Sequence, residues 1–248
     1  MEQPVEKSIP LQRRLELEGS YNIRDIGGYA TLDGYSTRWR VLLRGDSLHA
    51  LPQQSQRLLL AYPVRTIIDL RRSSELLKVP SIFAASSDVR YINVSLLEDQ
   101  QKVRDAPSLQ ELYQHILEMC QPEIQQILQL MATADIFPCV VHCAVGKDRT
   151  GLIIALLLSI ANVPVETIAS DYALSAGYLE PFFEILRARA AREAPDAQRS
   201  EWLLSALPET MIATLEYVKS RYGSVNDYLL AIGLTSQQLA TLRSILVE

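Results

Sequence analysis

A ten-residue loop, HCAVGKDRTG at residues 142–151, limits the fold of this chain more strongly than any other segment. Residues 136–141 before it form a short apolar run typical of a buried strand, and residues 152–161 after it are typical of a buried helix. In such a strand–loop–helix unit the backbone N–H groups of the loop converge, and the helix N-terminus adds partial positive charge. The sequence therefore predicts a cradle for a phosphate-like anion, and we call residues 143–149 the cradle.

Cys143 and Arg149 stand at the two ends of the cradle and enclose five residues. Arg149 can offer a planar fork to two phosphate oxygens, which a lysine cannot do. Cys143 would point its sulfur at the bound phosphorus. Because the groups that hold a dianion also stabilise a thiolate, we expect the pKa of Cys143 to be depressed. The residues expected to bind phosphate are Ala144, Val145, Gly146, Lys147, Asp148 and Arg149.

Two further β-rich runs, at residues 64–70 and 89–94, are expected to be strands. Strands that alternate with helices, followed by a largely helical C-terminal half, predict an α/β fold with a central, mostly parallel sheet flanked by helices. Ligands bind at the carboxyl ends of the strands in such sheets. The cradle, residues 69–72 and residues 96–105 are therefore expected to share one edge of the sheet.

The C-terminal half is expected to be helical from about residue 164, with one helix at 166–178 and another at 181–194. We interpret the chain as an N-terminal lead-in at residues 1–18 and a single domain at residues 19–248. A helical lid over the site is a hypothesis for residues 164–207, which are long and rich in Ala, Arg and Glu.

The composition excludes several classes of function. The formal net charge of −5 argues against a general nucleic-acid binder, which usually carries a basic face. The longest apolar run, residues 151–161, is too short to span a bilayer, so no integral membrane segment is expected. The polar N-terminus lacks the apolar core of a signal peptide, which indicates a cytoplasmic location and leaves export by a signal-less route open. Three cysteines and three histidines give no framework of disulfides and no suitably spaced metal ligands, so no metal or cofactor is expected.

The loop resembles the signature of the cysteine-dependent protein tyrosine phosphatase superfamily, in which His-Cys is followed by five residues and then by Arg and Thr or Ser. Within this superfamily, the sequence GKDRTG resembles that of an atypical bacterial branch active on phosphotyrosine and often on phosphoinositides. Weaker likenesses to that branch are NIRDIGG at residues 22–28, IIDLR at 67–71, and YGS with YL within 222–229. The resemblance spans about residues 17–234, and it implies that residues 19–248 are one tyrosine-phosphatase-like catalytic domain.

By this resemblance the reaction is hydrolysis of a phosphomonoester in two steps through a cysteinyl-phosphate. Cys143 would attack phosphorus in line, while Arg149 and the loop amides hold the equatorial oxygens. Thr150 would hydrogen-bond to the sulfur and help it leave in the second step, and His142 would brace the loop rather than act as a base. The expected partners are a phosphoprotein or phosphoinositide substrate and a phosphate ion in the site.

Three aspartates are candidates for the general acid that protonates the leaving group. The Trp-Pro-Asp loop that carries this acid in many tyrosine phosphatases is absent from the sequence. Asp148 is the first candidate, although its basic neighbours in the cradle would depress its pKa. Asp99, or its neighbour Glu98, is the second, because related enzymes place the acid after the corresponding strand. Asp69 is the third, and for it a structural bond to Arg71 is an equally strong interpretation.

Lys147, together with Arg71 or Arg72, would add positive charge at the rim of the site and suit a substrate with further phosphates. Alternatively, Lys147 raises the local potential for any phosphoester. The main interpretation is a phosphatase of phosphotyrosine proteins, with possible activity on phosphoserine and phosphothreonine. The alternatives are a phosphoinositide phosphatase and a non-catalytic module that binds phosphate. Cys139 is expected to be a buried apolar residue, although it could protect Cys143 by forming a disulfide.

Overall fold

A five-stranded sheet in the order β1-β2-β5-β3-β4 forms the centre of the computed structural model, which describes residues 11–99, 106–193 and 204–248. The strands are β1 (Arg24–Asp25), β2 (Leu42–Gly45), β3 (Thr66–Asp69), β4 (Arg90–Asn93) and β5 (Cys139–His142). β1 is antiparallel to β2, whereas β2, β5, β3 and β4 are parallel to their neighbours. The expected strands are present, and their ends differ from the predicted ranges by a few residues.

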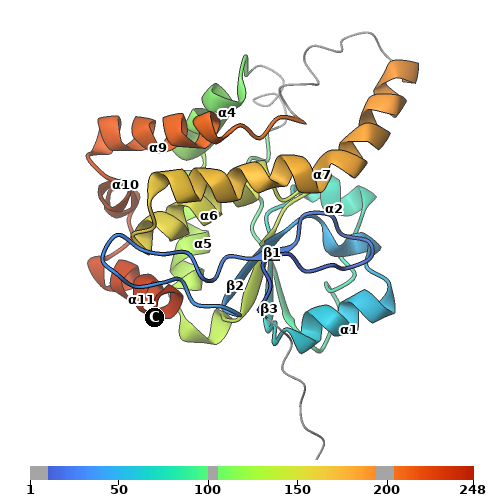
Figure 1. The fold of residues 1–248 in the computed structure, drawn as a ribbon, viewed down its shortest axis with the longest axis horizontal. Helices are drawn as coiled ribbons and strands as arrows, with labels where there is room; N and C mark the ends of the chain where they lie inside the picture. The colour runs from blue at the N-terminus through green and yellow to red at the C-terminus, as the bar shows by residue number, and fades with distance from the viewer. Residues whose placement is uncertain (1–10, 100–105, 194–203) are drawn as a thin grey trace, which may run out of the picture.

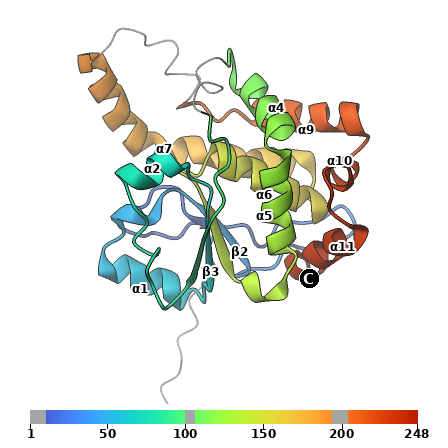
Figure 2. The same cartoon turned by 180° about the vertical axis from the view of Figure 1, so that it is seen from behind.

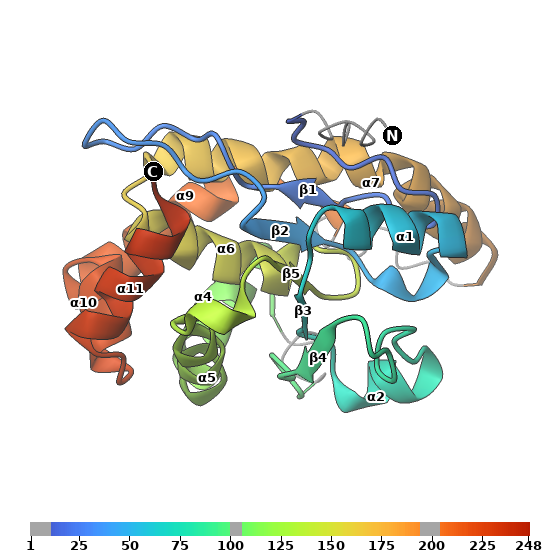
Figure 3. The same ribbon diagram turned by 90° about the horizontal axis from the view of Figure 1, so that it is seen from below.

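Helices cover both faces of the sheet and make up most of the C-terminal half (Figure 1), which confirms the predicted fold class. They are α1 (Gln53–Ala61), α2 (Ser73–Lys78), α4 (Leu109–Met119), α5 (Gln121–Met131), α6 (Asp148–Ile160), α7 (Val165–Glu193), α9 (Pro208–Tyr222), α10 (Val225–Ala231) and α11 (Ser236–Leu246). Short 3-10 helices lie at η1 (Leu48–Ala50) and η2 (Ala134–Ile136). Figure 3 shows α1 on one side of the sheet and α4, α5 and α6 on the other.

Alternating side chains of the central strands enter two hydrophobic cores. On β5, Val141 faces the larger core with α4, α5 and α6, and Val140 faces the smaller core with α1. Both faces of a parallel sheet are covered, so these strands are apolar throughout. α6 is buried along almost its whole length, which holds the loop that precedes it on a rigid support.

The helices expected at residues 166–178 and 181–194 form one continuous helix, α7, which contains Pro181. Proline removes one backbone hydrogen bond and crowds the residue four positions earlier. That residue is Gly177, which has no side chain to add to this crowding. α7 packs against α6 and α9 (Figure 1). None of the described helices, α7 included, is long and apolar enough to cross a membrane.

The hypothetical lid at residues 164–207 includes α7 and the segment that leads into α9. Residues 194–203 lie outside the described residues, so the lid hypothesis stays a prediction.

Candidate active site

The cradle lies at the carboxyl edge of the sheet, between the end of β5 and the start of α6. Asp69 at the end of β3 is paired with His142 at the end of β5, so the two strand ends meet there. α2 and α4 stand on either side of this edge (Figure 2). The expected convergence of the cradle with residues 69–72 is therefore confirmed. Of residues 96–105, those from 100 onwards lie outside the described part of the chain.

Hydrogen bonds from other segments hold the backbone carbonyls of the cradle outwards. The oxygens of Ala144, Val145 and Gly146 accept hydrogen bonds from the Ser47 amide (3.0 Å), the Asn22 side chain (2.8 Å) and Arg44 Nη2 (2.8 Å), respectively. In a planar trans peptide the C=O and the following N–H point in opposite directions. The N–H groups of Val145, Gly146 and Lys147 therefore point to the inside of the loop, where no acceptor among the described residues reaches them. Three convergent donors of this kind form a binding site for an anion.

Gly146 is the residue that lets the loop turn tightly. Its φ is +68°, a left-handed conformation that favours glycine. A Cβ built on Gly146 would lie 2.3 Å from the carbonyl oxygen of Gly45 in β2. The loop can approach the sheet this closely only because position 146 has no side chain.

Arg149 is fixed by one edge of its guanidinium group. Nη1 and Nη2 donate to the two carboxylate oxygens of Glu75 at 2.7 and 2.8 Å, and Nη1 also donates to the carbonyl of Leu70 at 3.2 Å. These bonds use three of the five N–H donors of the group. The Nε–H and one Nη2–H remain on the other edge without a partner in the described chain, and they form a fork suited to two phosphate oxygens.

Glu75, on α2, is the site residue that sequence reasoning missed. Burial raises the pKa of Glu75, but the hydrogen bonds and charge of Arg149 outweigh burial and lower it to about 2. Burial also lowers the pKa of Arg149, and the bonds to Glu75 and the charge of Cys143 reverse that effect and raise it. The pair is therefore fully ionised. A glutamate in the first turn of a helix was the available signal, because its side chain accepts from the Arg72 amide as in a helix cap.

Cys143, Thr150 and His142 are all buried at the base of the cradle. The hydroxyl of Thr150 has no hydrogen-bond partner among the described residues. His142 Nδ1 lies 3.2 Å from the carbonyl oxygen of Cys143, and its Nε2 lies 3.5 Å from Asp69 without a hydrogen bond. Burial lowers the pKa of His142, so the ring is neutral near pH 7. Its position between strand and loop suits the bracing role that we expected.

Asp148 and Lys147 are bonded to one another at the start of α6. Asp148 Oδ1 accepts from Lys147 Nζ at 2.7 Å and from the Tyr113 hydroxyl at 2.6 Å, and Tyr113 bonds in turn to Tyr172 at 2.7 Å. Burial and the charge of Asp148 raise the pKa of Tyr113, so this tyrosine stays protonated and donates. Oδ2 of Asp148 has no bond within the described residues.

The rim position expected for Lys147 does not fit the structure. Its side chain is only 1% exposed, because Nζ also donates to the carbonyl of Ser205 at 2.8 Å. Arg71 is likewise buried, and it forms a bidentate pair with Asp69. Neither cation lies at a rim in this conformation. Each cation is paired with a carboxylate of the protein, Lys147 with Asp148 and Arg71 with Asp69.

Asp69 and Asp99 occupy very different environments. Asp69 accepts from Arg71 and from the Tyr91 hydroxyl at 2.8 Å. Burial raises the pKa of Asp69, but His142 and Arg71 outweigh burial and lower it, so this carboxylate is held ionised as a structural group. Asp99 is exposed at the end of a described segment, and Glu98 beside it accepts from Ser95 and from the Ser73 amide.

The suggested disulfide between Cys139 and Cys143 is wrong. Cys139 begins β5 and Cys143 follows its last residue, so four extended residues of about 3.3 Å each separate them, well over the 7 Å that a disulfide tolerates. Both are free cysteines, and burial raises the pKa of Cys139. Within the described residues no cluster of His, Cys, Asp and Glu could hold a metal ion.

Comparison with known proteins places this geometry in context. A family model described as the tyrosine phosphatase family matches residues 15–248. A tyrosine-protein phosphatase of Nostoc commune is 32% identical over 212 residues, which cover 81% of this chain and 72% of that protein. The triple specificity protein phosphatase PtpB of Mycobacterium tuberculosis is 24% identical over 277 residues, covering 94% of this chain and 98% of that protein. The crystal structure of P. aeruginosa TpbA aligns at 15% identity and a TM-score of 0.42, covering 81% of this chain and 91% of that one.

Proposed function

This chain is an enzyme of the tyrosine phosphatase family, and from that membership we propose that it hydrolyses phosphotyrosine in proteins through a cysteinyl-phosphate on Cys143. The observation that carries the proposal is the cradle itself. Three N–H groups that point to the inside of the loop and the open edge of Arg149 belong to the same short segment that begins at Cys143. Such preorganised donors stabilise the charge that develops on the equatorial oxygens of a transferring phosphoryl group.

The proposed reaction has two steps. In the first, the thiolate of Cys143 attacks phosphorus, the S–P bond forms, the P–O bond to the tyrosine ring breaks, and an acid gives its proton to the leaving oxygen. In the second, water attacks phosphorus, the same acid group takes the proton of that water, and the S–P bond breaks to release phosphate. The unpartnered hydroxyl of Thr150 supports its role as donor to the departing sulfur.

Asp148 remains our choice for the acid. It opens the helix next to Arg149, and its side chain is 25% exposed, so it can reach a substrate. The Tyr113 hydroxyl and Lys147 both donate to Oδ1, which leaves Oδ2 as the oxygen to carry the proton. Asp69 is a weaker choice, because its carboxylate is held by Arg71 and Tyr91. Asp99 stays the runner-up.

Phosphotyrosine is our first substrate, and phosphoserine, phosphothreonine and phosphoinositides are the finer alternatives. The triple specificity in the name of the mycobacterial relative supports testing several classes of phosphomonoester. Against a lipid headgroup with several phosphates stands the burial of Lys147 and Arg71, whereas Arg72 is partly exposed and paired with Glu75. A panel of phosphotyrosine peptide, phosphoserine peptide and phosphoinositide vesicles distinguishes these substrates.

The proposal predicts that Cys143→Ser abolishes turnover of an aryl phosphate while tungstate, a phosphate analogue, still binds. The alcohol of serine is too weak a nucleophile, but the N–H groups and Arg149 remain in place. Turnover is measured against pH in the presence of a chelator, and tungstate binding by calorimetry. Cys120→Ser, which changes a buried cysteine that packs with the larger core, is the matched control and is expected to keep full turnover.

Asp148→Asn and Asp99→Asn decide which residue is the acid. If Asp148 has this role, its loss lowers turnover of aryl phosphates by about 10²–10⁴-fold and removes the acid-requiring limb of the pH profile. Asp99→Asn then leaves both unchanged. Measurable hydrolysis by Cys143→Ser would contradict the covalent mechanism, and an effect confined to Asp99→Asn would move the acid to the loop after β4.

A further inference from the structure

A buried aspartate on α7 joins two arginines behind the cradle. Asp171 is 1% exposed, and Arg24 and Arg44 are equally buried. We propose that Asp171 is a positioning residue that sets the shape and the charge of the phosphate cradle through these two arginines. The inference rests on the proposed function, since it assigns a role in binding the phosphoryl group.

Two chains of hydrogen bonds lead from Asp171 to carbonyls of the cradle. In the first, Arg44 Nη1 donates to Asp171 Oδ2 at 2.6 Å, and Nη2 of the same group donates to the Gly146 carbonyl at 2.8 Å and lies 3.4 Å from the Lys147 carbonyl. The guanidinium is a rigid plane, so the aspartate that fixes one nitrogen also fixes where the other points.

The second chain runs through Arg24 and Asn22. Arg24 Nε donates to Asp171 Oδ1 at 3.0 Å, and its Nη1 donates to the side-chain oxygen of Asn22 at 2.5 Å. Asn22 then donates from Nδ2 to the Val145 carbonyl at 2.8 Å. These bonds turn two carbonyl groups of the cradle outwards, and thus turn the N–H groups of Gly146 and Lys147 to the inside of the loop, where an anion would bind.

The three buried groups also place charge behind the cradle. These two guanidinium groups and one carboxylate sum to +1, and the buried carboxylate of Asp46, which accepts from the Asn22 amide, lies beside them. Burial and the neighbouring Arg24 lower the pKa of Arg44, and Asp171 acts against both effects. Burial raises the pKa of Asp171, but the two arginines outweigh burial and lower it, so the carboxylate is ionised. Without Asp171 two like charges would face one another in a buried site.

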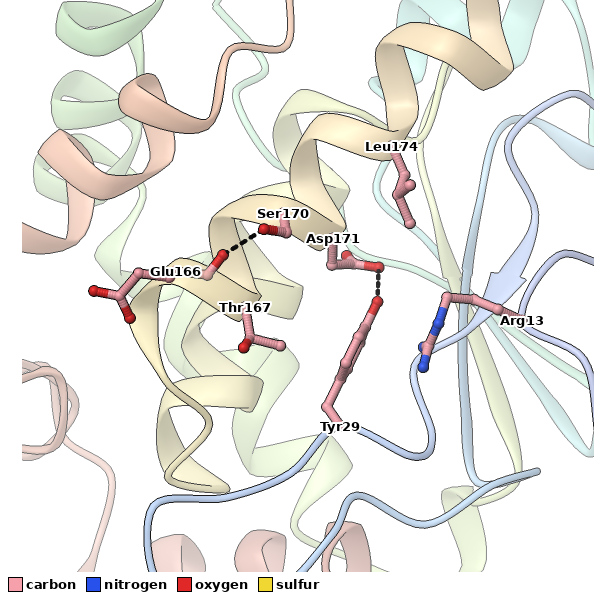
Figure 4. Close-up of a pocket in the computed structure, with 7 residues that line it drawn as sticks. All are labelled: Arg13, Tyr29, Glu166, Thr167, Ser170, Asp171 and Leu174. Atoms are coloured by element: carbon pink, nitrogen blue, oxygen red, sulfur yellow. Dashed lines mark hydrogen bonds between the residues drawn. The ribbon is translucent and has the colours of Figure 1, made fainter.

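Tyr29 is a partly exposed residue outside the cradle that contacts this network. Its hydroxyl donates to Asp171 Oδ1 at 2.9 Å, as Figure 4 shows, while its ring forms a wall of a hollow of about 300 Å³ between the N-terminal segment and α7. The other residues that line this hollow are Arg13, Glu166, Thr167, Ser170, Asp171 and Leu174. A change at Tyr29 therefore removes one bond to Asp171 without touching the cradle.

The first test compares Asp171→Asn and Tyr29→Phe with two exposed controls. An asparagine at 171 offers one side-chain oxygen in place of two, so Arg44 loses the carboxylate that fixes it, whereas Arg24 keeps its bonds to the backbone carbonyl of residue 171 and to Ser175. We expect tungstate affinity and kcat/KM to fall by about 10- to 100-fold in Asp171→Asn and to fall less, in the same direction, in Tyr29→Phe. Asp135→Asn, which breaks the exposed pair with Arg90, and Tyr35→Phe should change neither.

Three readouts separate positioning from a merely structural role. They are tungstate affinity, the split between kcat and KM, and the pH dependence of alkylation of Cys143, all measured well below the unfolding temperature of each variant. Arg44→Lys keeps the charge but cannot bond Asp171 and Gly146 together, so it should resemble Asp171→Asn. The double variant should be little worse than Asp171→Asn alone, because Asp171→Asn already breaks the chain through Arg44.

The inference is overturned if Asp171→Asn and Tyr29→Phe lower only the unfolding temperature and leave tungstate affinity and the alkylation profile as in the wild type. That outcome leaves the proposed function standing, because wild-type turnover of aryl phosphate is measured in the same series. Failure of the wild type to turn over any phosphomonoester would instead contradict the proposed function, and this inference with it.

Discussion

The residue that best shows how the site works is Arg149, because its two edges have separate tasks. One edge is bound by both oxygens of Glu75 and by the Leu70 carbonyl, and the other is left for phosphate. A long arginine side chain loses much of its rotamer entropy when it binds a ligand. Glu75 holds Arg149 in its extended position beforehand, so that this entropy is already lost in the free enzyme.

Replacing Glu75 with glutamine should therefore weaken phosphate binding. The amide group offers Arg149 one acceptor in place of two and carries no charge, so we expect kcat/KM for an aryl phosphate to fall by about 10-fold. Steady-state kinetics and tungstate binding measure the change. Glu216→Gln, at an exposed glutamate on α9, is the matched control. If Glu75→Gln binds tungstate as tightly as the wild type, preorganisation of Arg149 by Glu75 is excluded.

Sequence spacing explains which of these residues could be predicted. Cys143, Gly146 and Arg149 lie within one short loop, and the sequence of this loop is enough to predict an anion site. The partners of that loop come from far along the chain, 74 residues away for Glu75 and Arg149, and 102 for Arg44 and Gly146. No local pattern in the sequence indicates that Arg24 and Arg44 both bind an aspartate on a later helix.

At the scale of elements, the cradle depends on a close contact between the β5–α6 loop and β2. The N–H groups converge only if Gly146 stays in its left-handed conformation against Gly45. The buried helix α6 fixes the other end of the loop. The sequence predicted the strand, the loop and α6, because their apolar runs are continuous. It failed at α7, because a proline normally marks the end of a helix and here the helix continues through Pro181.

Two glycine-to-alanine changes test this dependence on β2. In Gly146→Ala the new Cβ would lie 2.3 Å from a backbone oxygen, so the loop must move, and we expect loss of tungstate binding and of turnover together with a lower unfolding temperature. Gly177→Ala adds a Cβ where no atom lies within 4 Å, inside α7. Alanine is favoured over glycine in helices by about 1 kcal/mol, so this variant should unfold at a temperature about 2–4 °C higher and keep its activity. Full activity of Gly146→Ala would show that the close approach is dispensable.

At the scale of the whole molecule, buried ionised groups gather around the carboxyl edge of the sheet. Asp69 and the half-buried Glu75 each hold an arginine there and Asp171 holds two, and in each carboxylate the pKa is lowered although burial alone would raise it. The sequence predicted that this edge would carry the site, because the carboxyl ends of parallel strands meet there. It could not predict the number of buried ion pairs, which depends on how the helices close over the edge.

This arrangement makes the protein sensitive to acid. A carboxylate with a lowered pKa stabilises the fold fully above its unfolded pKa, near 4, and this contribution is lost as the pH falls towards the folded value. His142 destabilises the fold at a higher pH than the carboxylates do, because burial lowers its pKa. Below about pH 6.5 the unfolded chain takes up a proton on this histidine that the folded protein does not, and the free energy of unfolding decreases. Asp25 has the opposite sign, since burial raises its pKa, and it partly offsets the carboxylates.

We therefore expect the free energy of unfolding in urea to decrease below about pH 6.5 and to decrease more steeply below about pH 4.5, with each displaced pKa unit worth about 1.4 kcal/mol. Asp69→Asn should lower this free energy at pH 7, because it leaves Arg71 without its buried partner, and should make the acid slope shallower because one titrating carboxylate is gone. Asp88→Asn, at an exposed aspartate, should leave the profile unchanged. A profile that is flat between pH 7 and 4, or that Asp69→Asn does not alter, would mean that these buried pairs do not control stability in acid.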